Sequence, residues 1–336
     1  MIGQRGGKCS LIIYPCSNSL INSFRSGVVL LIFLMEVGGV AVGEDFKWSG
    51  AVEISGTRQW VEVKGSDIRN PVLLFLHGGP GNSMIPYSNR FTDKLQHHFL
   101  VVMWDQRGSG KTATLNLAGP TPSVEAMHQD VKSMIDYLRD RFSQDKIYLA
   151  GHSWGGFLAL HAAAEYPELL RACFAISPMV NQVESERLSL LWMKERVSGK
   201  GREAARELES IKLPFEQGLH LYYHRKWLAL LQAQKPPSKA FVLSWSRRWL
   251  PLFAEASAVN LSEKVDSIRC PVFFFIGQKD YQTHFKITQD FFQTVKAEKK
   301  ELFWFTNSGH NLNLAEPNKL QAVSYTHLTL PTNREV

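Results

Sequence analysis

Six short apolar runs recur along the chain, and stretches with helical periodicity stand between several of them. The runs read VLLFL (72–76), LVVMW (100–104), KIYLA (146–150), CFAIS (173–177), VFFFI (272–276) and LFWFT (302–306). Residues 123–142 and 154–166 instead place apolar side chains three or four positions apart, as a helix does. Strands that are apolar throughout are buried on both faces, so the pattern predicts an α/β fold with a mostly parallel sheet covered by helices on both sides.

Two regions depart from this alternation. Short segments at 51–55 and 59–63 predict an opening hairpin around Gly56. Residues 179–265 contain several helix-like segments and no apolar strand run, so we expect a helical cap inserted after the strand that ends near Ser177. The sheet and its helices would then come from two stretches, residues 44–178 and residues 266–323.

The strongest chemical motif is GHSWGG at residues 151–156. It fits the pattern G-x-S-x-G and stands between an apolar run and a helix, which is the context that the motif requires. We expect a turn so sharp that side chains at Gly151 and Gly155 would collide with neighbouring backbone. Such a turn places the hydroxyl of Ser153 at the open edge of the sheet and makes it the candidate nucleophile. The alternative is a serine that only caps the following helix.

A serine nucleophile needs a histidine base and a carboxylate that orients the base. Asp280 follows the VFFFI run and His310 follows the LFWFT run. The carboxyl ends of parallel strands meet at one edge of a sheet, so both side chains should lie near Ser153. Asp266 precedes its strand and would lie at the opposite edge. We therefore predict Ser153, Asp280 and His310 as the catalytic triad, and the alternative is a turn aspartate with a loop histidine.

Acyl transfer by a serine also needs two N–H donors for the developing oxyanion. One candidate is the amide of Trp154, at the start of the helix that follows the nucleophile. The other is the amide of Gly79 in the loop HGGPG (77–81), where glycines let the backbone turn its amides inward. This chemistry requires no metal and no cofactor. The segment GSGKT (108–112) is similar to the end of a nucleotide-binding loop, but Asp105 stands where the first glycine is required, so we expect no nucleotide site.

Three motifs together, LHGGPG (76–81), WDQRGSG (104–110) and GHSWGG (151–156), resemble those of the proline iminopeptidases, also called prolyl aminopeptidases, in the S33 group of serine peptidases. The resemblance runs from the opening hairpin to the segment after His310. It implies an α/β-hydrolase fold, the triad named above and an oxyanion site at Gly79 and Trp154. It also implies a helical cap that selects the amino-terminal residue of the substrate.

The resemblance further implies acidic residues in the cap that bind the α-ammonium group of the substrate. Glu184 and Glu186 open the cap directly after the strand that ends at Ser177, and they are our candidates. A carboxylate in a sheltered site would pair with the ammonium group. The alternative is that two glutamates in the first turn of a helix interact favourably with its dipole.

These observations together predict a serine hydrolase, and in particular an aminopeptidase that releases the first residue of short peptides through an acyl-enzyme on Ser153. A carboxylesterase or another acyl hydrolase on the same fold is the alternative, and a catalytically inactive binding protein is a remote one. The expected partner is a small peptide or ester. The net charge of +7 forms no basic run, so no nucleic-acid partner is expected. Four scattered cysteines make neither a disulfide framework nor a zinc site.

The amino-terminal segment differs in composition from the rest of the chain. The run VVLLIFLM (28–35) follows Arg25 and is short for a membrane-spanning helix. A basic residue, a short apolar run and small residues before Glu44 predict a signal peptide or leader in residues 1–43. The protein would then be exported to the periplasm or secreted. A cytoplasmic protein with an irrelevant leader is the alternative, and membrane contact is expected only if the run is retained.

The carboxyl-terminal segment also breaks its pattern. Residues 314–323 have the spacing of a closing helix, with Pro317 in its first turn. The following segment, SYTHLTLPTNREV, loses that spacing and contains Pro331. We therefore expect residues 324–336 to be an irregular or non-native tail.

Overall fold

The computed structural model describes residues 45–116, 119–197 and 201–329. The predicted leader, residues 1–43, lies outside the described residues, and so do residues 330–336 of the expected tail. Export of the protein and a foreign origin of the tail therefore stay predictions. No helix within the described ranges is long and apolar enough to cross a membrane.

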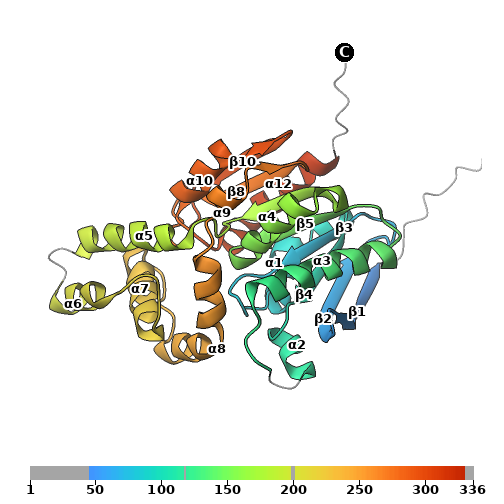
Figure 1. The fold of residues 1–336 in the computed structure, drawn as a ribbon. Helices are drawn as coiled ribbons and strands as arrows, with labels where there is room; N and C mark the ends of the chain where they lie inside the picture. Colours follow the sequence, from blue (N-terminus) through green and yellow to red (C-terminus); the bar gives the residue numbers. More distant parts are fainter. Residues whose placement is uncertain (1–44, 117–118, 198–200, 330–336) are drawn as a thin grey trace, which may run out of the picture. The chain divides into compact units, whose positions relative to one another are not determined.

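An eight-stranded sheet lies at the centre of the fold, with the strand order β1-β2-β4-β3-β5-β6-β8-β10 (Figure 1). The strands are β1 (Phe46–Ile54), β2 (Thr57–Gly65), β3 (Val72–Leu76), β4 (Leu100–Asp105), β5 (Ile147–His152), β6 (Leu170–Ile176), β8 (Val272–Gly277) and β10 (Lys300–Phe305). β1 and β2 form the predicted hairpin, and β2 pairs antiparallel with β4. All neighbours from β4 to β10 are parallel. Each predicted apolar run is therefore a strand, and the expected mostly parallel sheet is confirmed.

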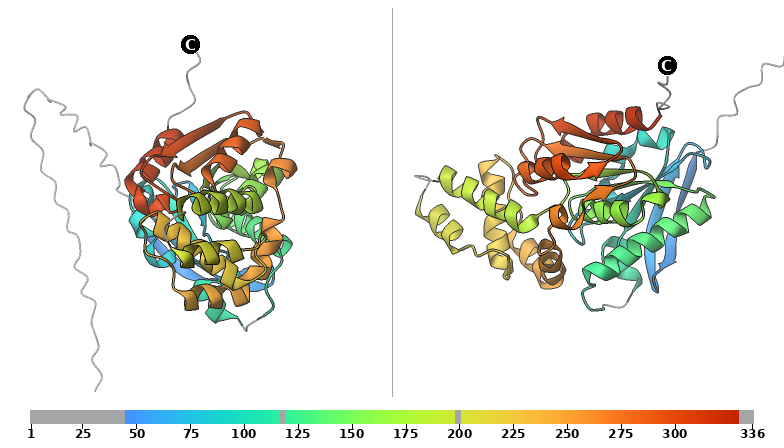
Figure 2. Two further views of the ribbon diagram at one scale, coloured as in Figure 1. Left: turned by 90° about the vertical axis from the view of Figure 1, so that its left-hand side faces the viewer. Right: turned by 45° about the horizontal axis from the view of Figure 1, so that its top comes forward.

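Both faces of the sheet are covered by helices (Figure 2). Successive side chains of a strand point to opposite faces. Leu74 of β3 accordingly belongs to an apolar cluster with helices α3 (Val124–Arg141) and α4 (Trp154–Glu165). Leu73 and Phe75 belong to a second cluster with α1 (Asn89–Thr92) and α12 (Pro317–Thr329). The other helices that flank the sheet are α10 (Phe285–Thr294) and α11 (Leu312–Ala315).

A helical cap follows β6, as predicted, and the chain returns from it to β8. Its helices are α5 (Gln182–Val197), α6 (Arg202–Ser210), α7 (Gly218–Leu231) and α8 (Lys239–Ser257). The short helix α9 (Leu261–Lys264) and the small sheet of β7 (Ser267–Ile268) and β9 (Lys296–Ala297) lead back into the core. Helix α8 is tied to two loops of the core. Trp245 Nε1 donates to the carbonyl oxygen of Pro80 at 2.8 Å, and Thr121 Oγ1 donates to that of Arg248 at 2.9 Å.

The last helix is longer than the sequence predicts. Helix α12 continues through Ser324, whose Oγ donates to the carbonyl oxygen of Leu320 at 2.8 Å. Tyr325 stacks on His98 with ring centroids 3.8 Å apart. The expectation of irregular chain is therefore wrong for residues 324–329. Contacts with the core stabilise this turn although its apolar spacing is weak, because tertiary packing supplies most of the stability of helices in proteins.

Candidate active site

Ser153 occupies the sharp turn between β5 and α4 that the motif predicts. Its φ is +57° and its ψ is −116°, a backbone conformation that strains a residue other than glycine. A Cβ on Gly151 would lie 2.0 Å from the carbonyl oxygen of Gly155, and a Cβ on Gly155 would lie 2.2 Å from that of Leu76. Only glycine fits at these two positions, so the steric reason given for the motif is confirmed.

The side chain of Ser153 is not used to cap its helix. It forms no capping hydrogen bond with α4, although Ser153 directly precedes the helix. Ser153 is 5% exposed and lines a cavity between the core and the cap. The structure therefore argues against the alternative of a helix-capping serine and leaves the hydroxyl on the cavity wall.

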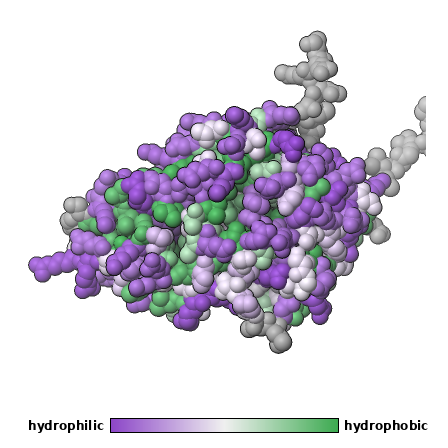
Figure 3. All heavy atoms as spheres, viewed as in Figure 1, coloured by the Kyte–Doolittle hydropathy of each residue, from purple (hydrophilic) through white to green (hydrophobic). Residues whose placement is uncertain are grey.

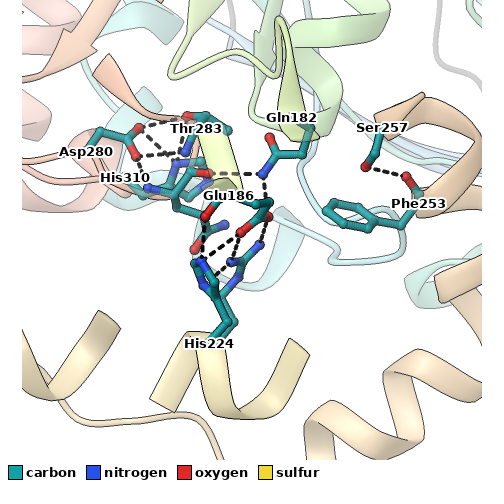
Figure 4. Close-up of polar contacts among 10 residues, drawn as sticks. Gln182, Glu186, His224, Phe253, Ser257, Asp280, Thr283 and His310 are labelled. Atoms are coloured by element: carbon teal, nitrogen blue, oxygen red, sulfur yellow. Dashed lines mark hydrogen bonds and ion pairs between the residues drawn. The ribbon is translucent and has the colours of Figure 1, made fainter. Parts of the chain in front are cut away.

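His310 and Asp280 meet as predicted (Figure 4). His310 Nδ1 lies 3.0 Å from Asp280 Oδ2, and Asp280 is fully buried in the turn after β8. Burial raises the pKa of this carboxyl, but His310 and hydrogen bonds from Thr283 outweigh that effect and lower the pKa to about 2. The ionised carboxylate can only accept, so Nδ1 carries the proton and Nε2 of His310 is left as the basic nitrogen.

Two further residues hold this pair, and neither is predicted from the sequence. Thr283 Oγ1 lies 2.9 Å from Asp280 Oδ2 and 3.2 Å from His310 Nδ1. His152, next to the nucleophile, places Nε2 3.0 Å from the carbonyl oxygen of His310 and must donate to it. Burial lowers the pKa of His152 to about 4, so its ring is neutral near pH 7. His152 stands inside the predicted motif, whereas no pattern in the sequence distinguishes Thr283.

The glycine-rich loop after β3 approaches Ser153 from the neighbouring strand. Gly79 lines the same cavity, and its φ of +121° is a conformation that favours glycine. Trp154 is fully buried at the first position of α4, where its Nε1 donates to Gln106 Oε1 at 3.0 Å. The structure thus brings Gly79 beside Ser153 and keeps Trp154 rigid. The oxyanion role of the two backbone amides stays a prediction.

The cavity that Ser153 lines has a volume of about 380 Å³. Core residues at its wall include Gly79, Ser153 and His310, and apolar cap residues include Leu221, Leu228, Val242, Trp245 and Phe253. Its charged lining residues are Arg225 and Lys235, and no aspartate or glutamate of the described chain lines it. The arrangement suits acyl transfer from a small, mostly apolar group.

Comparison with known proteins supports the same chemistry. The family model of the S33 serine aminopeptidases matches residues 67–318. The probable aminopeptidase YbaC of Bacillus subtilis is 31% identical over 292 residues, which cover 79% of this chain and 91% of that protein. A proline iminopeptidase of Saccharolobus solfataricus is 25% identical over 76% of this chain and 83% of its own length. This chain belongs to the S33 serine aminopeptidase family.

Solved structures confirm the α/β-hydrolase fold of this S33 family member. The proline iminopeptidase of Mycobacterium smegmatis aligns with a TM-score of 0.57 at 17% identity, over 84% of this chain and 97% of that one. An esterase of Pyrococcus furiosus aligns with a TM-score of 0.56 at 17% identity, over 84% and 90%. The fold is therefore common to peptidases and esterases, and the chain is a hydrolase of this type.

Both glutamates proposed for the S33 cap have partners within the protein, and neither lines the cavity. Glu184 lies in the first turn of α5 and forms a bidentate pair with Arg187, at 2.6 Å for each contact. Glu186 is 2% exposed and forms a bidentate pair with Arg225, at 2.6 and 2.7 Å. Direct binding of a substrate amine by either glutamate stays a prediction.

Two of the residues that contact Glu186 line the cavity, and neither was among the residues predicted from the sequence. They are Arg225 from α7 and Gln182, the first residue of α5. Gln182 belongs to the same short segment as the predicted glutamates, so position along the chain could have suggested it. Arg225 lies 39 residues beyond Glu186, and no local pattern connects the two.

This S33 protein should lose stability in acid because several of its histidines are buried in the neutral form. Burial lowers the pKa of His152 and of His224 to about 4 and that of His128 to about 3. Below pH 6.5 the unfolded histidines bind protons that the folded ones do not, so stability falls as the pH is lowered from 6.5 towards 4. Each histidine contributes at most about 1.4 kcal/mol per pH unit.

A variant at His128 tests this expectation away from the cavity. His128 stacks on His161 with ring centroids 3.4 Å apart, and its buried Nε2 has no hydrogen-bond partner among the described residues. His128→Phe keeps a ring at this position and removes the titrating group. Its melting temperature should fall less steeply between pH 7 and pH 5 than that of the wild type. If the melting temperatures of the two proteins fell equally with pH, the low pKa of His128 would be contradicted.

Proposed function

We propose that this protein is a serine aminopeptidase that releases the amino-terminal residue of short peptides. The observation that carries the proposal is the hydrogen-bonded pair of Asp280 and His310 at the wall of the cavity that Ser153 lines. Aminopeptidase and proline iminopeptidase relatives support the amino-terminal specificity.

Each residue named for the site has one role in the proposed reaction. Ser153 Oγ attacks the scissile carbonyl while Nε2 of His310 accepts its proton, and Asp280 stabilises the imidazolium that forms. The amides of Gly79 and Trp154 hold the oxyanion. His310 then protonates the leaving amine, and water activated by the same imidazole hydrolyses the acyl-enzyme.

The cap supports a preference for short substrates with an apolar first residue. Figure 3 shows apolar residues gathered over the cap on the face in view, with hydrophilic residues around them. Leu191, Leu230 and Phe241 are among the exposed large apolar side chains, and all three belong to cap helices. Phe241 is 58% exposed and also lines the cavity, so an apolar side chain of a substrate meets apolar surface where the cavity opens.

One observation favours the alternative of a carboxylesterase. No carboxylate of the described residues lines the cavity, although a free α-ammonium group in a sheltered site is usually bound by one. An uncharged acyl group would need no such partner. The two functions therefore differ in whether the enzyme requires a free α-amino group on its substrate.

A substrate panel separates them. Aminoacyl 4-nitroanilides, their N-acetylated counterparts and 4-nitrophenyl acetate should be assayed with the same preparation. The proposal predicts that kcat/KM for free aminoacyl anilides exceeds that for the N-acetylated ones by at least about tenfold, because binding of the free amino group would be lost. Hydrolysis of the ester alone, or a preference for N-acetylated substrates, would replace the aminopeptidase with an acyl hydrolase of another specificity.

A further inference from the structure

Gln182 has an amide oxygen that the protein itself leaves unused. Its Nε2 donates to Glu186 Oε1 at 2.6 Å and to the carbonyl oxygen of Gln282 at 3.0 Å. Both partners are oxygens that can only accept, so the orientation of the amide is determined and cannot be reversed. Its Oε1 is buried and has no hydrogen-bond partner among the described residues. Gln182 is 2% exposed, and it lines the cavity that Ser153 lines.

The Gln182 amide is held by the carboxylate of Glu186, which has several other hydrogen-bond donors around it. The carboxylate of Glu186 receives two contacts from Arg225, one from Gln182 and one from His224 Nε2 at 3.1 Å. Burial raises the pKa of Glu186, but Arg225 and His224 outweigh that effect and lower it, so the carboxylate is ionised. Both of its oxygens already accept from protein donors. The cluster therefore holds the Gln182 side chain in one orientation (Figure 4).

An unpaired buried acceptor is rare in folded proteins and asks for an explanation. Gln182 is a residue of the cavity wall, and its amide oxygen, buried beneath that wall, points away from Glu186 (Figure 4). A bound molecule with an N–H group could satisfy it. No acidic side chain of the described residues lines the cavity, so an amino group that enters it has no carboxylate there to pair with.

We propose that Gln182 binds the α-amino group of the substrate, with Oε1 accepting a hydrogen bond from the N–H of that group. This inference rests on the proposed aminopeptidase function and names the residue that would select its substrates. The class of substrate is a short peptide or aminoacyl amide with a free amino group. Glu186 and Arg225 act through Gln182 as positioning residues. A neutral amide then has the role that the sequence predicts for a glutamate of the cap.

A cycle of two proteins and two substrates tests the contact. The proteins are the wild type and Gln182→Met, which keeps the length of the side chain and removes its oxygen. The substrates are the 7-amino-4-methylcoumarin amides of L-alanine and of propionic acid, which differ only in the α-amino group. We expect Gln182→Met to lower kcat/KM for the alanine amide by about 10- to 100-fold, as for the loss of a hydrogen bond to a charged group. For the propionic amide we expect a change of less than about threefold.

Two further variants keep the test informative. Gln182→Asn withdraws the oxygen by one methylene. It should also lower the ratio of kcat/KM for the alanine amide to kcat/KM for the propionic amide, and it serves as the test if the methionine variant folds poorly. Gln232→Met is the matched control, because Gln232 also lines the cavity but donates its Nε2 to the carbonyl oxygen of Lys279 at 2.6 Å. It should leave the ratio of the two kcat/KM values unchanged.

The possible failures are distinct. If Gln182→Met lowers kcat/KM equally for both amides, Gln182 has only a structural role, and the inference is wrong while the aminopeptidase function stands. If the wild type prefers the propionic amide, or cleaves neither amide and only esters, the proposed function is wrong and the inference falls with it.

Discussion

Replacing Ser153 with alanine should lower kcat by about 10⁶-fold, because the hydroxyl that forms the acyl-enzyme is lost. The fold should persist, since the Ser153 side chain caps no helix and alanine has the same backbone requirements at this φ. Turnover of the best aminoacyl 4-nitroanilide and the thermal melting curve measure the two effects. Labelling by a fluorophosphonate probe should disappear together with activity.

A second serine variant controls for nonspecific damage. Ser257 is buried in helix α8, and its Oγ donates to the carbonyl oxygen of Phe253 within the same helix at 2.6 Å. Ser257→Ala should retain both the activity and the labelling of the wild type. If Ser153→Ala kept a tenth of the wild-type rate, Ser153 could not be the nucleophile.

Asp280→Asn should lower kcat by roughly 10⁴-fold while leaving the cavity intact. An asparagine amide no longer fixes the proton on Nδ1 of His310, so Nε2 can carry the proton instead and then cannot accept one from Ser153. The pKa of Asp280 in the wild type is about 2, so its carboxylate is ionised at every pH of a normal assay. A loss of wild-type activity in mildly acidic buffer should therefore not come from protonation of Asp280.

Asp266→Asn is the comparison for this second variant. Asp266 is exposed, and it precedes β7 and β8 in the chain, whereas Asp280 follows β8. Its replacement should change kcat by less than about threefold, as for most surface substitutions away from a site. A larger loss from Asp266→Asn than from Asp280→Asn would mean that another carboxylate orients the base.

Much of the fold follows from local patterns. The apolar runs at 72–76 and 272–276 are strands within one residue of the predicted bounds, because a segment that is apolar on both faces has to be buried in the middle of a sheet. Gly151 and Gly155 likewise mark the nucleophile turn, since a Cβ at either position would collide with backbone. Chain order and the strand ends were then enough to pair Asp280 with His310.

The amino-acid sequence by itself therefore determined the sheet, the turn at Ser153 and the acid–histidine pair, because apolar periodicity and steric exclusion act over a few residues. Tertiary structure alone decided how polar groups from distant segments meet. It brought His152 to the carbonyl of His310, and it paired Glu186 with Arg225 and left the oxygen of Gln182 without a partner among the described residues. Such contacts join elements far apart in the chain, and only their packing sets which donor reaches which acceptor.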